Sequence, residues 1–233
     1  MIDDKLQCVK LKGLRHFWII GAGRFGKMAV ERITRRFPQA TIKVVDHQTA
    51  DIDHPRVTVI RHDAIDWLAA TLHRDASVDV IIPAIPVHVA AEWIKRKLLD
   101  IYVLHSIEIP DAWIGQLPHA IPGAAGQFYV SHADFICPDN CPEPKTICTH
   151  TGEPRPGDLF RLLAEINLGN TTCIILRSHQ LEPGVGGLLP ADLISALDTG
   201  RSRRQQQVMV ATACRCHGVV DFIGLKRKGR VTS

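Results

Sequence analysis

Three glycines near the start of the chain constrain its fold more than any other feature. They follow an apolar run and form the pattern Gly-x-Gly-x-x-Gly at Gly21, Gly23 and Gly26. In a strand-turn-helix unit the first glycine permits a tight turn, the second lets backbone approach a pyrophosphate, and the third lets the helix pack on the strand. Free N–H groups and the positive end of the helix dipole then favour a phosphate. The pattern predicts a dinucleotide-binding βαβ unit.

The residues after the glycines support this prediction. Apolar side chains recur at helical spacing and stop at Pro38, which indicates an amphipathic helix. The β-branched run 41–46 follows and ends on Asp46, whose carboxylate would accept hydrogen bonds from ribose hydroxyls. His47 and Gln48 come next, where an arginine would favour a 2′-phosphate. We therefore expect NAD(H) as the cofactor, in preference to NADP(H).

Strands and helices alternate through residues 1–110, the expected dinucleotide-binding domain. Further strand-like runs are 57–60, 78–82 and 101–104, and helical segments follow near 66 and over 87–98. This alternation predicts an α/β fold with a Rossmann-like, doubly wound parallel sheet. Its ligands bind beyond the carboxyl ends of the strands, where the winding reverses. The residues expected around that crevice are Gly21, Gly23, Arg24, Phe25, Gly26, Asp46, Asp63 and Ala84.

The first hundred residues resemble the TrkA-N nucleotide-binding domains, the RCK modules that regulate potassium channels and transporters. The matching segments are 19–26, 44–46, His62-Asp63-Ala64 with Asp66, and 79–82. The resemblance implies a regulatory or redox-sensing NAD(H)-binding protein and places Asp63 near the adenine. His62 stands where that family has a glycine.

The turn at 83–88 is more similar to that of saccharopine-dehydrogenase-like and other Rossmann oxidoreductases, whose equivalent loop passes the nicotinamide. An NAD-dependent oxidoreductase is therefore an open alternative. In that case His88 is the candidate catalytic residue, because an imidazole titrates near neutrality and can donate a proton. The sequence assigns no carboxylate to orient it, and a solvated histidine at a helix start is the plainer interpretation.

Residues 111–156 form a region rich in proline, glycine and cysteine. It contains a group of candidate metal ligands at Cys137, Cys141, Cys148 and His150. Proline stiffens the segment, and a stiff loop loses less entropy when a metal closes it. Zinc or an iron–sulfur cluster would suit these ligands, with a thiol of Cys214-Arg-Cys216-His217 as a further one. The spacing matches no standard pattern, so free structural thiols, a thiol redox role and an electron-transfer accessory function are alternatives.

Residues 157–233 form a C-terminal α/β extension whose strands either continue the first sheet or build another. The chain has 233 residues, 45% hydrophobic, and a formal charge of +4. The basic clusters 201–204 and 226–230 lack interleaved aromatics, so nucleic-acid binding is not expected. The candidate partners are therefore the dinucleotide and, as an open alternative, another protein or a second copy of the chain.

No apolar stretch approaches the length that crosses a bilayer, which predicts a chain without a membrane span. The opening Met-Ile-Asp-Asp-Lys does not resemble a secretory signal, so the expected location is the cytoplasm. There the seven cysteines are expected as thiols or metal ligands and not as disulfides.

Overall fold

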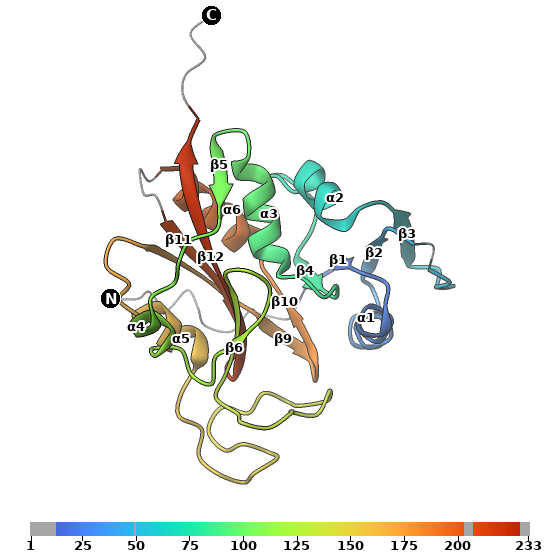
Figure 1. Cartoon of the computed structure of the whole chain (residues 1–233). Coiled ribbons are helices and arrows are strands. Elements are labelled where there is room, and N and C mark those ends of the chain that lie inside the picture. The colour runs from blue at the N-terminus through green and yellow to red at the C-terminus, as the bar shows by residue number, and fades with distance from the viewer. Residues whose placement is uncertain (1–12, 49, 203–206, 229–233) are drawn as a thin grey trace, which may run out of the picture.

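A computed structural model describes residues 13–48, 50–202 and 207–228 (Figure 1). The opening residues and parts of both basic clusters, on which the location and nucleic-acid predictions depend, lie outside these ranges. The helices are α1 (Arg24–Arg36), α2 (Ala64–Thr71), α3 (Val89–Leu98), α4 (Asp111–Ile114), α5 (Leu159–Glu165) and α6 (Pro190–Ser202). Within the described ranges, none of them has the length and apolar character needed to cross a membrane.

The strands belong to two main sheets and a small hairpin. They are β1 (His16–Ile20), β2 (Thr41–Asp46), β3 (Val57–Arg61), β4 (Val80–Pro83), β5 (Tyr102–His105), β6 (Ile121–Pro122), β7 (Gln127–Ser131), β8 (Thr172–Arg177), β9 (His179–Glu182), β10 (Val185–Gly187), β11 (Gln207–Ala213) and β12 (His217–Arg227). The strands and longer helices predicted from periodicity are therefore present, with ends shifted by a few residues.

The first sheet has the strand order β3-β2-β1-β4, and its strands are parallel. Alternate β1 residues point to opposite faces. Phe17 and Ile19 pack with α1, whereas Trp18 and Ile20 pack with α2 and α3. Helices thus cover both faces, and the predicted α/β class with a parallel sheet is confirmed.

The later strands form a separate, mixed sheet. Its order is β6-β7-β12-β11-β8, with β5 also paired to β12. The long strand β12 runs antiparallel to β11, β7 and β5, whereas β11 is parallel to β8. Of the two arrangements that the sequence left open, the second sheet is the one observed. In Figure 1 α3 and α6 lie between this sheet and the first.

The strand expected at 101–104 is present as β5, but it does not extend the parallel sheet. It pairs with the second half of β12, where Leu104 faces Leu225. The open edge beside β4 is instead occupied by the segment after β10, since Ile81 and Leu188 form an antiparallel bridge. The parallel sheet therefore ends at β4.

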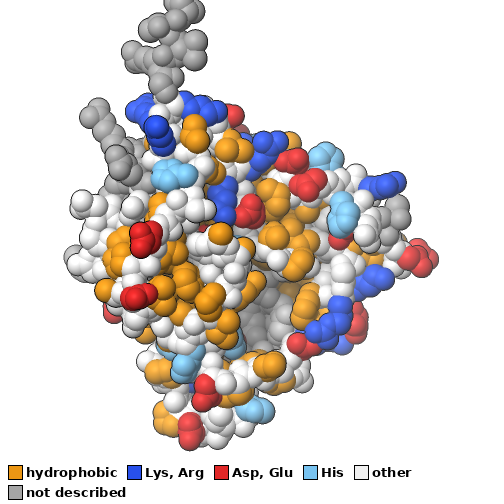
Figure 2. All heavy atoms as spheres, viewed as in Figure 1, with side chains coloured by type: hydrophobic (Ala, Val, Ile, Leu, Met, Phe, Trp, Pro, Cys, Tyr) orange, Lys and Arg blue, Asp and Glu red, His pale blue; other side chains and the backbone are white. Residues whose placement is uncertain are grey.

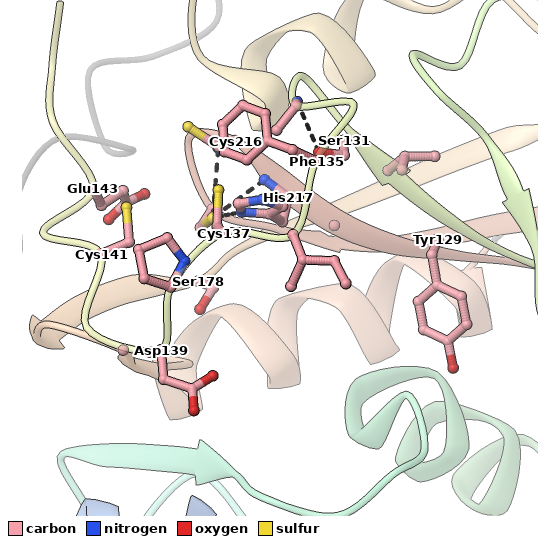
Figure 3. Close-up of a pocket in the computed structure, with 18 of the residues that line it drawn as sticks. Tyr129, Ser131, Phe135, Cys137, Asp139, Cys141, Glu143, Ser178, Cys216 and His217 are labelled. Atoms are coloured by element: carbon pink, nitrogen blue, oxygen red, sulfur yellow. Dashed lines mark hydrogen bonds between the residues drawn. The ribbon is translucent and has the colours of Figure 1, made fainter. Parts of the chain in front are cut away.

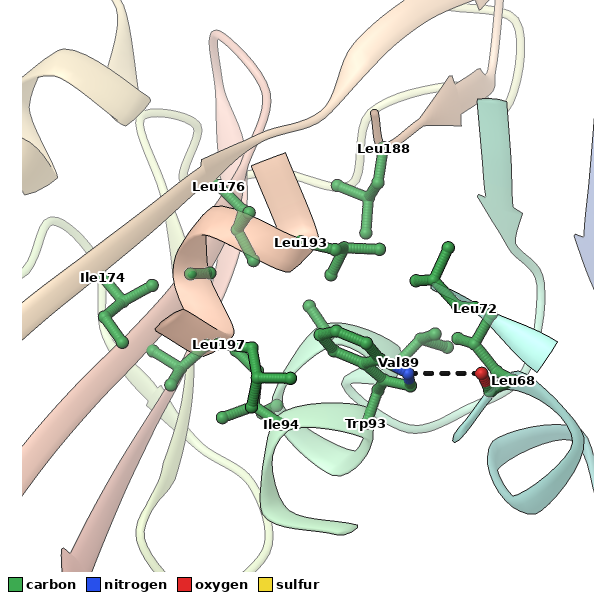
Figure 4. Packing of buried hydrophobic residues seen from close by; sticks show 14 of the residues in the cluster. Leu68, Leu72, Val89, Trp93, Ile94, Ile174, Leu176, Leu188, Leu193 and Leu197 are labelled. Atoms are coloured by element: carbon green, nitrogen blue, oxygen red, sulfur yellow. Dashed lines mark hydrogen bonds between the residues drawn. The ribbon is translucent and has the colours of Figure 1, made fainter. Parts of the chain in front are cut away.

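The two sheets share a hydrophobic core built around α3 (Figure 4). Trp93 is 1% exposed, and its indole Nε1 donates a hydrogen bond to the Leu68 carbonyl at 3.3 Å. Leu193 and Leu197 of α6 and Leu176 of β8 belong to the same core. Because α3 contributes to both halves, the first sheet is held in a fixed position against the second, and a crevice at its edge has a defined opposite wall.

Candidate functional site

The glycine turn follows β1 and lies against the loop after β4. Gly21 has a φ of +114°, and a Cβ at this position would lie 2.6 Å from the Ala84 carbonyl oxygen. A side chain there would be strained and would also clash. A Cβ on Gly26 would collide with the Gly21 carbonyl, because α1 begins directly against the turn. Packing within the protein therefore explains the first and third glycines.

Gly23 is the N-cap of α1, a position that glycine shares with several polar residues, and no packing contact requires a glycine there. Its φ of −68° is accessible to any residue, and a Cβ there would meet no protein atom within 4 Å. Gly23 is exposed and immediately precedes α1, whose first N–H groups have no acceptor inside the helix. The missing side chain leaves space at the end of a helix that favours anions.

Asp46 ends β2 beside this turn. Its Oδ2 accepts a hydrogen bond from the Ala22 N–H at 2.7 Å, and its Oδ1 accepts one from the Gln48 N–H at 2.9 Å. Burial raises the pKa of Asp46, but the two N–H groups and the charge of His47 outweigh it, so the pKa lies below its ordinary value. The carboxylate is held ionised; Oδ1 also lies 3.2 Å from His47 Nδ1, whereas Oδ2 keeps a lone pair for a further donor.

The other residues predicted at the crevice lie at the same edge of the sheet. Ala84 contacts the turn through Gly21, as described above. Asp63 follows β3, one strand beyond Asp46, and its Oδ1 accepts the Asp66 N–H at 2.8 Å as the N-cap of α2. The structure thus brings Gly21, Asp46 and Ala84 together at the glycine turn. Asp63 lies one strand further from the turn, and one of its carboxylate oxygens is already occupied by the Asp66 N–H.

A cavity of about 1000 Å³ lies beside Phe25, and the other residues predicted at the crevice, all of them within the described ranges, do not line it. In the view of Figure 2 the surface is hollowed between the half that carries α1 and the half that carries the cysteine-rich segment. Phe25, which is 46% exposed, contributes to the wall, and Tyr129 and His217 contribute from the second sheet. The Arg24 guanidinium donates a hydrogen bond to the Asp139 carboxylate at 2.7 Å. Arg24 and Phe25 therefore face the cysteine-rich segment.

That segment is fastened to the second sheet by Arg155, whose side chain is 3% exposed. Its guanidinium donates to the carbonyls of Lys145, Gly157 and Arg215 at 2.6–2.9 Å. Its Nε also donates to the Cys216 Sγ at 3.1 Å. One buried cation therefore joins the loop to the turn between β11 and β12.

The predicted metal ligands are only partly brought together. Cys137 and Cys141 line the cavity with Cys214 and Cys216, and the six cysteines in the described ranges are free thiols. His150 stacks on Phe135 with ring centroids 4.6 Å apart. Over residues 13–48, 50–202 and 207–228, no three His, Cys, Asp or Glu side chains are placed to hold one metal ion. The set Cys137, Cys141, Cys148 and His150 is therefore not assembled around a single ion.

His88 is the N-cap of α3, near the predicted helix start, but it is buried and not solvated as expected, and it packs in the interface between α3 and the second sheet. Its Nδ1 is 2.7 Å from Asp221 Oδ2, and its Nε2 is 2.8 Å from Thr212 Oγ1. Lys95 Nζ donates to the other Asp221 oxygen at 2.9 Å. Both ring nitrogens are occupied and the side chain is 2% exposed, so this geometry favours a structural role over proton transfer at the crevice.

Sequence reasoning missed three residues that organise the site: Asp139, Arg155 and Asp221. Asp139 lies between two of the cysteines, and its partner Arg24 is 115 positions away. The sequence alone assigned no carboxylate partner to His88. In the structure that partner is Asp221, which lies 133 positions later in the chain. The one signal for Asp221 was a charge inside an otherwise apolar strand, since a buried charge needs a partner.

Comparisons with known proteins give relatives whose descriptions name no activity. Residues 90–226 match the AF_1314_C family, which is described as the C-terminal domain of an uncharacterized protein. The chain is also similar to an uncharacterized protein of Archaeoglobus fulgidus, with 28% identity over 220 residues. That alignment covers 88% of this chain and 97% of the relative. No solved structure matches.

Proposed function

We propose that this chain, which belongs to the AF_1314_C family, binds NAD(H) at the glycine turn and responds to the bound nucleotide through the adjoining cavity. The observation that carries the proposal is Gly23. Neither its backbone conformation nor its packing requires a glycine, so the empty volume next to it is explained by a ligand that approaches the main chain.

The surrounding groups suit the parts of the dinucleotide. The N–H groups at the start of α1 would bind the pyrophosphate, because they point outward and carry the positive end of the helix dipole. Asp46, ionised and fixed by two backbone donors, would accept the ribose hydroxyls. A carboxylate repels a 2′-phosphate, which favours NAD(H) over NADP(H).

The nicotinamide half would extend toward Phe25 and the cavity behind it. Bound NAD(H) can supply or accept a hydride there. A regulatory or redox-sensing role is supported by the Arg24–Asp139 ion pair, because it connects the pyrophosphate end of the site to the cysteine-rich segment. Phosphates near Arg24 would compete with Asp139 for the guanidinium and alter that connection.

An NAD-dependent oxidoreductase is the second candidate function. It is favoured by the size of the cavity, about 1000 Å³, which exceeds what a nicotinamide ring needs and is in the range of small-molecule sites. His217 lines that cavity and replaces His88 as the candidate group for proton transfer; burial and the charge of Arg155 lower its pKa, which favours the neutral, proton-accepting form. Turnover of NADH with an electron acceptor, lost in His217→Ala with binding retained, would favour this candidate.

The proposal is tested by titrating the full chain with NADH and NADPH in a calorimeter. We expect NADH to bind more tightly than NADPH, and Asp46→Ala to weaken NADH binding by about 10-fold or more, since a charge-assisted hydrogen bond contributes about 1.5–3 kcal/mol. Asp51→Ala, an exposed acid outside the site, is the matched control and should bind normally. Absence of NADH binding to the folded wild-type chain would refute the proposal.

A further inference from the structure

The cavity beside Phe25 collects exposed apolar side chains from separate parts of the chain. Eight large hydrophobic side chains of the described residues are exposed, and four of them line this one cavity: Phe25, Ile121, Tyr129 and Ile136. They come from the start of α1, from β6, from β7 and from the loop after β7. Apolar surface that converges on a hollow in this way is typical of a binding site. The wall therefore predicts a ligand with a large apolar part.

Aromatic rings make up much of this apolar wall. Phe25, Tyr129 and Phe135 all belong to the lining, and Figure 3 draws the last two. The Phe135 ring is held in place by its stacking on His150. Aromatic rings pair favourably with other rings, either stacked or edge to face. We therefore expect the apolar part of the ligand to be aromatic.

Two polar side chains of the lining, Glu143 and His217, have hydrogen-bonding capacity that the protein leaves unused (Figure 3). Glu143 Oε1 accepts the Arg215 N–H at 2.6 Å, whereas Oε2 accepts no hydrogen bond from the described part of the chain. His217 Nδ1 lies 4.0 Å from the Cys214 sulfur, and its Nε2 has no hydrogen-bond partner among the same residues. A carboxylate oxygen accepts hydrogen bonds, so a ligand with a hydroxyl group can donate to Glu143.

The backbone of Glu143 has an uncommon conformation. Among the non-glycine residues that the structure describes, two have a left-handed φ, His119 at +40° and Glu143 at +49°, and both line the cavity. Such conformations persist only where the surrounding structure imposes them, and they cluster at ligand sites. Their location supports the interpretation of the cavity as a binding site.

The charged groups of the lining indicate the charge of the ligand. Among the described residues the lining contains three acids, Asp134, Asp139 and Glu143, and no lysine or arginine. Asp139 is already paired with Arg24. Burial raises the pKa of Glu143, and the charge of Arg215 opposes that rise. An anion would therefore meet no basic side chain, and a cation would compete with arginines already in place, so a neutral ligand fits best.

We infer that the cavity binds a neutral aromatic molecule that carries a hydroxyl group, with its rings against Tyr129 and Phe135 and its hydroxyl donating to Glu143. The volume of about 1000 Å³ is at the upper end of the range for small-molecule sites and has room for several rings. The inference goes beyond dinucleotide binding and does not rest on it, because these three residues lie outside the glycine turn.

The test is a calorimetric titration of the full chain, without nucleotide, with beta-naphthol, its methyl ether and beta-naphthoate. We expect beta-naphthol to bind about 2- to 10-fold more tightly than the ether, which lacks the donor, and more tightly than the anionic naphthoate. Tyr129→Ala should weaken binding of beta-naphthol by about 5-fold or more, because it removes a ring from the wall. Val103→Ala is the matched control, since Val103 is also half-exposed on the second sheet but does not line the cavity.

A second variant tests the polar contact. Glu143→Gln keeps an acceptor for the Arg215 N–H and turns an amide donor toward the ligand, so the preference for beta-naphthol over the ether should be lost. Absence of beta-naphthol binding to the folded wild-type chain, tighter binding of the naphthoate, or equal weakening in Val103→Ala would overturn the inference. The wild-type comparison of the three probes needs no variant. NADH titration is a separate measurement, so failure of the dinucleotide proposal is recognised independently.

Discussion

The Arg24 guanidinium and the Asp139 carboxylate form an ion pair of 2.7 Å that joins the glycine turn to the cysteine-rich segment. Both side chains are largely solvated, at 72% and 48% exposed, so the pair contributes at most about 1 kcal/mol to stability. Its importance is positional, because Arg24 lies at the start of α1, where the proposed pyrophosphate would bind.

Replacing Asp139 should therefore change nucleotide affinity more than stability. In Asp139→Asn the guanidinium is released from its carboxylate and becomes available to phosphate. We expect NADH to bind about 2- to 5-fold more tightly, which corresponds to an exposed ion pair of up to about 1 kcal/mol. Calorimetric titration measures this, and Glu153→Gln, an exposed acid of the same region that does not line the cavity, is the control. Weaker binding in Asp139→Asn would mean that the pair does not compete with the ligand.

Substitution of Asp221 should be strongly destabilising. Its side chain is 4% exposed. The carboxylate accepts hydrogen bonds from Lys95 and Gln127 and also lies 2.7 Å from His88 Nδ1. Asp221→Asn removes one of the two carboxylates that pair with Lys95, the other being Glu92, and losing hydrogen bonds to a buried charged group costs about 1.5–3 kcal/mol or more. Urea unfolding measures the loss. Asp66→Asn, which removes the exposed ion pair with Arg96, should cost less than about 1 kcal/mol. Similar values for the two variants would contradict this assignment.

His179 should make stability depend on pH. It is 4% exposed, and burial together with the charge of Arg177 lowers its pKa to about 4. The unfolded chain takes up this proton near pH 6.5, before the folded chain does. Stability is therefore lost as pH falls from about 6.5 to about 4, by up to about 3 kcal/mol.

Unfolding in urea at several pH values checks this, with His179→Leu as the comparison. The variant should have a flatter pH profile over that window. His132 and His217, whose pKa values are also lowered by burial, account for the slope that remains. Parallel profiles for wild type and His179→Leu would show that His179 is not the titrating group.

The three glycines should respond differently to alanine. Gly21→Ala places a side chain on a residue with positive φ and drives its Cβ into the Ala84 carbonyl. We expect this variant to lose at least about 2 kcal/mol of stability. Gly23→Ala meets neither, and because glycine is preferred to alanine at an N-cap, its stability should fall by no more than about 1 kcal/mol. Thermal unfolding separates the two. A large loss in Gly23→Ala would mean that the turn itself requires this glycine.

Local patterns sufficed to predict the elements of the first sheet. The glycine spacing, the apolar helix stripe and the run ending at Asp46 each depend on neighbours within a few residues, where periodicity is informative. The N-cap of α2 is local in the same sense, because Asp63 accepts the N–H of Asp66 three positions later.

Pairings between distant segments were not predictable. The strand β5 carries no local sign that it pairs with β12, more than a hundred positions later, and not with β4. The partner of His88 lies 133 positions away. Cysteine spacing suggested His150 as a ligand, whereas its stacking on Phe135 and the approach of Cys216 depend on how Arg155 folds the loop back. Such contacts arise from tertiary packing, for which a single sequence has no periodic signal.

The central claim is tested most directly by NADH binding to Gly23→Asp beside the wild-type chain. An aspartate at this position has room and an allowed backbone conformation, so the variant should fold with wild-type stability. We expect the wild-type chain to bind NADH and the variant to bind at least about 100-fold more weakly, because two like charges in contact cost several kcal/mol. Equal affinity in a folded Gly23→Asp would contradict the account.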